Sequence, residues 1–426
     1  MLTPKAGRAA CIAQTGPVTT GCAGGHGLRG ARQVIVSPDG RSVYVASKDA
    51  LAVFARDPSN GSLRSAGCVA QFADDGCDRG LGSRLDSMVV SPDSRYVYAA
   101  GLAEVTTFQR DAHDGTLRWK AARMLCTPKN LPGRGCPTAR FFYPEALAMS
   151  RDGKNLYAGS EGGAMAILRR DPDSGRLTQP AGTQGCVSPM GGGCALGRAV
   201  VGTTALTVSG DGRNVYVGSS ISDAIAVFDR DTTNGALTQS AGADGCLSQP
   251  GKHDACTSVR GLDGADSVVV SPDGRTVYVA ASAANAVTVL RRGSGGDLTV
   301  MGCIGRSDTF CGYTLVEAYC DGENDSICAR GRALSRPRAV TVSRDGKSVY
   351  VAAAGSDAVV VFDRDPLDGS LRQKPGARGC VTDPPKSSCA AGRGLDGAGS
   401  VAVSDDGKSV YAASPSAGAV AIFDRR

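Results

Sequence analysis

The chain has 426 residues, of which 42% are hydrophobic and 21% are charged, an ordinary composition for a globular protein. Its 47 basic and 41 acidic residues are spread along the sequence, which argues against a dedicated nucleic-acid surface in spite of a net charge of +6. No apolar run approaches the roughly 18 residues that a membrane span needs, and no composition bias indicates a coiled coil, a collagen or a disordered chain.

The 16 cysteines form close sequential pairs that recur along the chain, separated by seven to ten intervening residues. The pairs are Cys11/Cys22, Cys68/Cys77, Cys126/Cys136, Cys186/Cys194, Cys246/Cys256, Cys303/Cys311, Cys320/Cys328 and Cys380/Cys389. Zinc sites prefer shorter spacings and more than the three histidines present, so the pattern favours local disulfides over metal ligation. Eight disulfides indicate an oxidising compartment. Residues 1–5 carry no apolar signal region, so we expect a secreted, periplasmic or cell-surface protein whose export signal lies outside this sequence.

A block of the form V-S-P-D-G-R-x-V-Y-V-A recurs seven times, at separations of 54 to 72 residues. Its aspartates are Asp39, Asp93, Asp152, Asp211, Asp273, Asp345 and Asp406. A tyrosine follows five residues after each: Tyr44, Tyr98, Tyr157, Tyr216, Tyr278, Tyr350 and Tyr411. Seven of the 11 tyrosines therefore occupy one column of the repeat.

Each copy predicts four short strands, shown most clearly by the fifth. There the expected strands cover 267–270, 276–280, 286–290 and 296–300, separated by turns rich in Asp and Gly. Short strands broken by such turns are typical of antiparallel hairpins. Four strands repeated seven times predict an all-β fold, the seven-bladed β-propeller.

The ends of the sequence complement each other. The seventh copy stops at residues 421–426, after its third strand, whereas residues 2–7 resemble the segment that follows a third strand elsewhere, such as 237–242. We therefore expect residues 1–426 to form a single propeller of four-stranded antiparallel blades. Residues 1 to about 7 would complete the last blade, which removes an exposed sheet edge.

The S-P-D-G-x-x-V-Y-V and V-x-V-F-D-R-D motifs resemble those of the YVTN-type, lactonase-like seven-bladed propellers, a family that includes 6-phosphogluconolactonase-like and muconate-cyclising enzymes. The resemblance covers essentially the whole chain. It implies ligand-binding His, Arg and Glu residues near the start of the innermost strands, often after a proline. Glu145 after Pro144 and Arg338 after Pro337 match that pattern, but no histidine does.

The first position of each predicted innermost strand varies from copy to copy, in contrast to the apolar positions that follow. This column reads Arg32, Asp86, Glu145, Thr204, Asp266, Arg338 and Gly399. It should line the mouth of the central funnel. We expect Glu145 to act as general base or acid and Arg32 and Arg338 to stabilise a carboxylate or oxyanion, with Asp86, Asp266 and Thr204 as ligand-binding residues. The competing interpretation, which the pattern favours slightly, is that these charges pair with one another around a water-filled tunnel.

A second column follows the cysteine pairs. It contains His26, Arg79, Arg140, Arg198, Arg260, Arg332 and Arg393. Six arginines in a ring could bind a polyanion, but a residue kept in every blade favours one structural task per blade, such as bonding loop carbonyls. His26 is the exception, and we expect it near the funnel as a ligand-binding residue.

Two stretches break the repeat. Residues 140–145 bring Arg140 and Tyr143 next to Glu145, which predicts either a stacking platform for a sugar or a local apolar plug. Residues 303–336 form a long loop with the additional cysteine pair, and we expect this loop to set specificity. Its acidic segment 321–325 has the alternating carboxylates of a calcium loop but lacks the distal Glu, which favours a solvated loop.

These features predict an exported lactonase-like propeller that binds or hydrolyses a small polar or sugar-derived ligand in its funnel. One alternative is a non-enzymatic secreted or cell-surface module that binds protein or glycan through its disulfide-stapled loops. Another, based on Tyr143 and Arg140, is a polysaccharide or uronate lyase. We predict a monomer with a small-molecule or carbohydrate ligand, no metal or cofactor and no nucleic-acid partner. Signals for other chemistry, namely the phosphate-loop, zinc-protease and serine-nucleophile motifs, are missing from the sequence.

Overall fold

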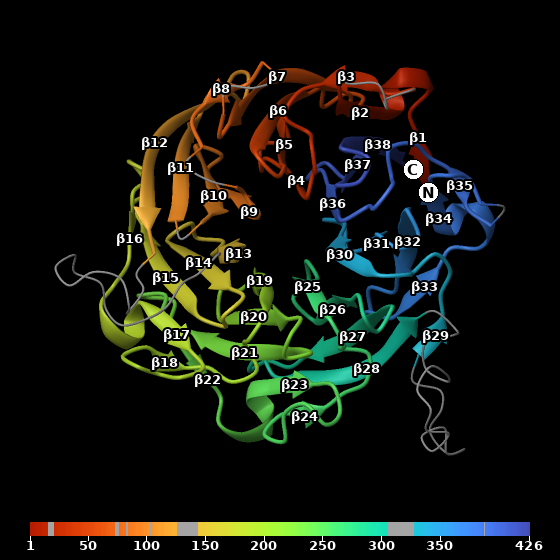
Figure 1. Ribbon diagram of the computed structural model, residues 1–426. Coiled ribbons are helices and arrows are strands. Elements are labelled where there is room, and N and C mark those ends of the chain that lie inside the picture. The colour runs from red at the N-terminus through yellow and green to blue at the C-terminus, as the bar shows by residue number, and fades with distance from the viewer. Residues whose placement is uncertain are drawn as a thin grey trace.

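In the computed structural model the chain forms a closed ring of seven β-sheets around a central channel, with the N- and C-termini side by side (Figure 1). The described residues are 1–15, 21–72, 76–81, 84–102, 104–125, 144–305, 328–386 and 388–426. The predicted seven-bladed β-propeller is therefore confirmed. Among the described residues, no helix is long and apolar enough to cross a membrane.

The first three blades follow one another along the chain. Blade 1 contains β4 (Gln33–Val36), β5 (Ser42–Ala46), β6 (Ala50–Arg56), β7 (Leu63–Ala70) and β8 (Asp78–Arg79). Blade 2 contains β9 (Ser87–Val90), β10 (Tyr96–Gly101), β11 (Glu104–Arg110) and β12 (Leu117–Met124). Blade 3 contains β13 (Pro144–Met149), β14 (Asn155–Ser160), β15 (Met165–Arg170), β16 (Leu177–Thr178), the 3-10 helix η2 (Gly182–Gln184), β17 (Cys186–Ser188) and β18 (Ala195–Leu196).

The remaining blades repeat this order. Blade 4 contains β19 (Thr203–Val208), β20 (Asn214–Ser219), β21 (Ala224–Arg230), β22 (Leu237–Gln239), η3 (Gly242–Gly245), β23 (Cys246–Ser248) and β24 (Thr257–Ser258). Blade 5 contains β25 (Ala265–Val270), β26 (Thr276–Ala281), β27 (Ala286–Arg292), β28 (Leu298–Gly305) and β29 (Cys328–Arg330). Blade 6 contains β30 (Pro337–Val342), β31 (Ser348–Ala353), β32 (Ala358–Arg364), β33 (Leu371–Gln373), η4 (Gly376–Gly379), β34 (Cys380–Thr382) and β35 (Ala390–Ala391). Blade 7 contains β36 (Ser400–Val403), β37 (Ser409–Ser414), β38 (Ala419–Arg425), β1 (Leu2–Pro4), η1 (Gly7–Ala10), β2 (Cys11–Gln14) and β3 (Ala23–Gly25).

The fourth strand of a blade is more elaborate than the sequence predicts. In blade 3 it is split into β16 and β17 by the single turn η2, and both parts pair with β15. After the cysteine pair a short strand, β18, adds in parallel to β17. Blades 4, 6 and 7 show the same split. The first three predicted strands of the fifth copy lie within β25, β26 and β27, and the fourth overlaps β28.

The N-terminus closes the ring as predicted, because β1 and β2 both pair antiparallel with β38. Leu2 is the backbone partner of Arg425 and is itself buried in the hydrophobic cluster that joins blades 6 and 7. The hydrophobic core is divided into such clusters, most of which combine residues of two adjacent blades. Apolar packing between blades therefore maintains the ring and leaves its axis open.

Candidate functional site

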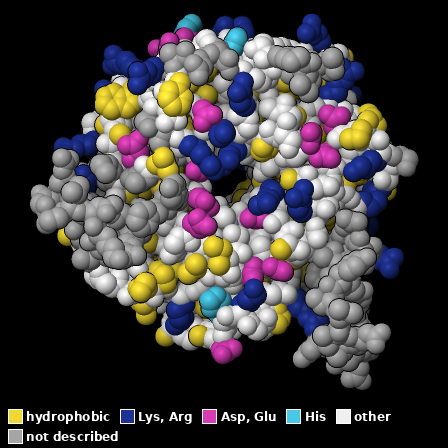
Figure 2. Space-filling model, in the orientation of Figure 1, with side chains coloured by type: hydrophobic (Ala, Val, Ile, Leu, Met, Phe, Trp, Pro, Cys, Tyr) yellow, Lys and Arg dark blue, Asp and Glu magenta, His cyan; other side chains and the backbone are white. Residues whose placement is uncertain are grey.

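A cavity of about 720 Å³ lies at the mouth of the channel and is lined by the starts of the innermost strands and by the adjoining loops of blades 6 and 7. The predicted residues Arg32, Thr204, Asp266, Arg338 and Gly399 all line it. Basic and acidic side chains gather around the central opening on this face (Figure 2). Five members of the variable column thus converge on one cavity, whereas Asp86 and Glu145 are not among the residues that line it.

Two blades contribute an ion pair on one side of the opening. The Nη1 atom of Arg32 donates to Oδ1 of Asp86 at 2.9 Å, and Arg84 bonds the same oxygen at 3.0 Å. Asp86 is therefore occupied by two guanidinium groups. The Arg32 side chain is 37% exposed, and its other nitrogens make no hydrogen bond within the described residues, so they are open to the cavity.

A second ion pair joins the innermost strands of blades 5 and 6. Nη1 of Arg338 is 3.4 Å from the Asp266 carboxylate, whose side chain is only 8% exposed. Burial raises the pKa of Asp266, and this effect exceeds the opposing contributions of the Ser282 hydroxyl and the Arg338 charge. Thr204, which also lines the cavity, donates its hydroxyl to the Ala265 carbonyl at 3.1 Å.

Glu145 is the second residue of β13 and is half-buried. Burial raises the pKa of its carboxyl group, the nearby charges of Glu161 and Asp86 raise it further, and Arg84 and Arg32 oppose them. Within the described residues no hydrogen bond or ion pair engages this carboxylate. Glu145 is consequently the one member of the column that combines a raised pKa with a carboxylate in no hydrogen bond or ion pair within the described residues, and the charges of Asp86 and Arg32 act on it.

Several lining residues were not predicted because they belong to loops rather than to the repeat column. Arg336, Asp357, Asp396 and Ser416 complete the wall on the side of blades 6 and 7. A comparison of loops between copies offers a signal for two of them, since the S-D-A and L-D-G sequences around Asp357 and Asp396 also occur in the fourth copy.

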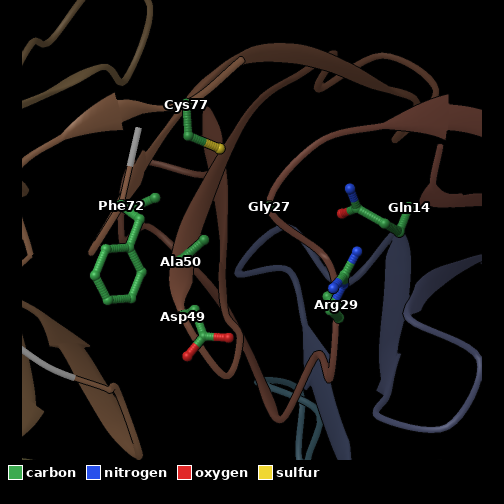
Figure 3. Close-up of a pocket in the computed structure, with 8 residues that line it drawn as sticks. Gln14, Gly27, Arg29, Asp49, Ala50, Phe72 and Cys77 are labelled. Carbon is green, nitrogen blue, oxygen red and sulfur yellow. The ribbon is translucent and has the colours of Figure 1, made fainter. Parts of the chain in front are cut away.

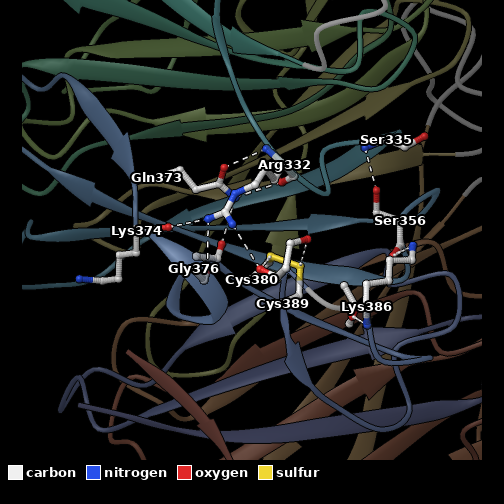
Figure 4. The surroundings of a disulfide bond; sticks show 12 residues. Arg332, Ser335, Ser356, Gln373, Lys374, Gly376, Cys380, Lys386 and Cys389 are labelled. Carbon is white, nitrogen blue, oxygen red and sulfur yellow. Dashed lines mark hydrogen bonds between the residues drawn. A yellow bond between two sulfur atoms is a disulfide. The ribbon is translucent and has the colours of Figure 1, made fainter.

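In the second predicted column three arginines donate to loop carbonyls, whereas the side chains of Arg79 and Arg260 make no hydrogen bond within the described residues. Nη2 of Arg332 donates to the carbonyls of Lys374 and Gly376 at 2.8 and 3.2 Å, beside the Cys380–Cys389 disulfide (Figure 4). Arg198 makes the equivalent two bonds at 2.8 Å, and Nη1 of Arg393 bonds the Gly21 carbonyl. These arginines bind loop carbonyls, as the structural interpretation requires. His26 is exposed and does not line the 720 Å³ cavity.

Some predictions fall outside the described residues. These are Arg140 and Tyr143 with their aromatic neighbours, the acidic segment 321–325 and the cysteines Cys126, Cys136, Cys311 and Cys320. Five predicted disulfides are present: Cys11–Cys22, Cys68–Cys77, Cys186–Cys194, Cys246–Cys256 and Cys380–Cys389.

A second, smaller cavity of about 90 Å³ lies between blades 7 and 1, where Gln14, Arg29 and Asp49 surround it and the exposed Phe72 forms its edge (Figure 3). It is much smaller than ordinary ligand sites, which run from about 300 to 1,000 Å³. The funnel cavity falls within that range and is the better candidate.

Comparison with solved structures identifies lactonase-like seven-bladed propellers as similar in fold. The periplasmic gluconolactonase of Pseudomonas aeruginosa is 20% identical, with a TM-score of 0.56 over 84% of this chain and 86% of that one. A Bacteroides fragilis protein assigned as a candidate 6-phosphogluconolactonase is 19% identical, with a TM-score of 0.54 over 80% and 82%. Hydrazine synthase of Kuenenia stuttgartiensis is 16% identical, with a TM-score of 0.54 over 96% and 98%. No family model matches the chain, and no curated protein does. At these identities the likeness concerns the fold, because one propeller fold serves many chemistries.

Proposed function

We propose that this protein is an exported lactonase-like propeller that binds and hydrolyses a small sugar-derived lactone at the funnel mouth. The observation that carries the proposal is the Glu145 carboxylate, which is half-buried, has a raised pKa and lies close enough to Arg32 for their charges to interact. Arg32 in turn lines the 720 Å³ cavity. The five disulfides support an oxidising location such as the periplasm, the cell surface or the exterior.

In the proposed reaction Glu145 acts as the general base. Its carboxylate accepts a proton from a water molecule whose oxygen attacks the lactone carbonyl carbon, and the resulting oxyanion is stabilised by Arg32 or Arg338. The ring C–O bond then breaks, the proton passes from Glu145 to the ring oxygen, and a hydroxy acid leaves. The ion pairs with Asp86 and Asp266 would hold the two guanidinium groups in place for this task.

The decisive experiment is a screen of aldonolactones and uronate lactones with the wild-type protein and the Glu145→Gln variant. We expect E145Q to lose at least about 100-fold in kcat, the usual scale for removing a general base, while its thermal unfolding is unchanged. The matched control is Glu104→Gln. Glu104 is also half-buried with a pKa raised by burial, but the only opposing effect on its carboxyl group is a hydrogen bond with Thr106, and none of the funnel charges that act on Glu145 acts on it. Equal activities of E145Q and E104Q, or a wild-type protein that turns over no lactone, would refute the proposal.

The second candidate function is a non-enzymatic interaction module. One support is the two ion pairs of the funnel, in which the charges of Arg32 and Arg338 are already paired with aspartates rather than left available for a substrate. The other support is a set of exposed apolar side chains. Among these, Met190 is 89% exposed and Leu196 is 61% exposed. The lyase alternative stays a prediction, since Arg140 and Tyr143 lie outside the described residues.

A further inference from the structure

The funnel cavity does not end at the channel axis. A second cavity of about 670 Å³ runs outward between blades 6 and 7, and the two cavities share Asp396 and Ser416 in their walls. We call the outer cavity the groove. Its walls include Asp383, Arg393 and Ala391 from blade 6 and Ala417 from blade 7. Each cavity alone has the volume of an ordinary small-molecule site.

The loops where the funnel meets the groove have equivalents between blades 4 and 5, and the comparison shows how their side chains differ. In both places a buried or half-buried aspartate accepts the N–H of a glycine: Gly264 donates to Asp223 at 2.8 Å, and Gly397 donates to Asp357 at 2.8 Å. In both places a second aspartate precedes that glycine, Asp263 in one and Asp396 in the other.

The two places differ in one residue that bonds the same loop. Gln249 accepts the N–H of Leu262 between blades 4 and 5. Its equivalent between blades 6 and 7 is Asp383, which accepts the N–H groups of Gly394 and Leu395 at 2.7 and 3.5 Å. A neutral amide is thus replaced by a carboxylate in the wall of the groove.

They differ also in the placement of a lysine. Lys252 lies against Asp223, with Nζ 2.7 Å from Oδ2. The equivalent Lys386 donates to the Ser356 carbonyl at 3.2 Å instead (Figure 4), and no ion pair joins it to Asp357 within the described part of the chain. Asp357, which lines the funnel, is therefore in no ion pair with this lysine, and the pKa of the neighbouring Asp396 is raised by burial and by the charges of Asp357 and Asp383.

The two cavities differ in their ligand preferences. Three arginines, Arg32, Arg336 and Arg338, line the funnel and suit an anionic or carbonyl-bearing group. Three aspartates share this lining, and one of them, Asp266, is paired with Arg338. The groove contains one arginine, Arg393, whose Nη1 donates to the Gly21 carbonyl. It presents the acceptor oxygens of Asp383 and Asp396 over small residues such as Gly392, which allows close approach of a ligand rich in hydroxyl donors.

We propose that the funnel and the groove form one elongated site, and that its ligand is a sugar acid or sugar lactone carrying at least one further sugar residue. The acidic or lactone end lies among the funnel arginines, and the hydroxyl-bearing residue lies along Asp383 and Asp396. This inference rests on the proposed function and specifies the class of ligand for the same site.

The test compares D-gluconate with cellobionate and maltobionate, in which a glucose is linked to gluconate, by titration calorimetry on the whole protein. We expect at least one two-residue acid to bind about tenfold more tightly than gluconate, a gain that Asp396→Asn abolishes. Asp263→Asn, the matched change between blades 4 and 5, should leave the gain intact. Ala391→Trp, which places a large side chain in the groove only, should also abolish it without weakening gluconate binding.

The possible results separate the two proposals. If gluconate binds but neither two-residue acid binds more tightly, or if D396N and D263N have the same effect, the elongated site is wrong and the funnel proposal stands. If none of the three acids binds, the funnel proposal fails and the elongated site fails with it.

Discussion

The hydroxyl of Tyr411 accepts a hydrogen bond from Nε of Arg56 at 2.8 Å, and this contact joins the last blade of the ring to the first. The same hydroxyl donates to the carbonyl of Gly61 at 2.8 Å, and Nη2 of Arg56 binds the carboxylate of Asp406. Every blade interface repeats the tyrosine–arginine contact. The other pairs are Tyr44–Arg110, Tyr98–Arg170, Tyr157–Arg230, Tyr216–Arg292, Tyr278–Arg364 and Tyr350–Arg425. The repeat residues visible in the sequence thus act between blades.

Removal of the Tyr411 hydroxyl should therefore weaken the ring. We expect Tyr411→Phe to lower the free energy of unfolding by about 1–3 kcal/mol, because it leaves the buried Gly61 carbonyl and Arg56 Nε without a partner. Urea denaturation at neutral pH measures this loss. Tyr350→Phe is the control, since no glycine carbonyl of a following blade accepts from Tyr350 within the described residues, and its loss should be smaller. Equal losses would mean that the carbonyl bond contributes nothing.

At another blade interface the carbonyl of Gly235 accepts the hydroxyl of Tyr157, and the surroundings of Gly235 leave no room for a side chain. Gly235 has φ +82°, and a Cβ added to it would lie 2.2 Å from Nδ2 of Asn155, which itself is held by Arg230. We expect Gly235→Ala to destabilise the protein by more than about 2 kcal/mol, from backbone strain and collision together. Gly251→Ala is the matched control. Its φ is +77° with open space around the added Cβ, so only the strain of about 1 kcal/mol should appear in thermal unfolding. Equal effects would exclude the collision.

The repeat aspartates predict loss of stability in acid. Burial by itself would raise the pKa of Asp345, but hydrogen bonds from Ser343 and Arg425 outweigh it and lower the pKa to about 2. The ordinary pKa of an unfolded aspartate is about 3.9. The stability that the ionised Asp345 adds to the folded state is therefore complete above pH 4 and is lost as the pH falls toward 2.

We therefore expect the urea midpoint to be constant from pH 5 to 7 and to fall steadily below pH 4. Asp345→Asn should lower the midpoint at pH 7 and flatten its decline in acid, whereas Asp254→Asn, at an exposed position with no partner in the described chain, should do neither. A midpoint of wild-type protein that does not change between pH 5 and pH 2.5 would contradict this account.

The backbone register makes a specific prediction for the cysteines of blade 5. Cys303 is disulfide-bonded, and in the parallel pair β28–β29 its backbone partner is Cys328. The disulfide Cys246–Cys256 bridges the equivalent position directly before the pair β23–β24. We expect mass-spectrometric mapping of the unreduced protein to find Cys303 linked to Cys328, in place of the sequential pairing with Cys311 predicted from the sequence. A peptide that links Cys303 to Cys311 would show that the sequential rule holds here too.

The repeat allowed the fold to be predicted because each copy carries its turn residues and its buried tyrosine in the same place. The sequence did not predict that the fourth strand is split in two, because the short 3-10 turn η2 that divides it in blade 3 has too few residues to show a helical periodicity. In the site, Arg32, Asp266 and Arg338 were found since they start innermost strands, whereas Asp357 and Asp396 occupy loops whose position depends on how two blades meet. Sequence periodicity describes one blade and does not describe the space between two unlike ones.

The pairing of β1 with β38 brings residues 1 and 426 together, where the N–H of Arg426 donates to the Met1 carbonyl at 2.9 Å. A short linker could therefore join them without disturbing a strand, and the polypeptide could be reopened in the exposed turn between Ser294 and Gly295. Such a circular permutant would keep all seven interfaces between blades. Blade 7, which now combines strands from both ends of the chain, would become continuous in sequence. The order in which the segments are synthesised would change, and the finished toroid would not.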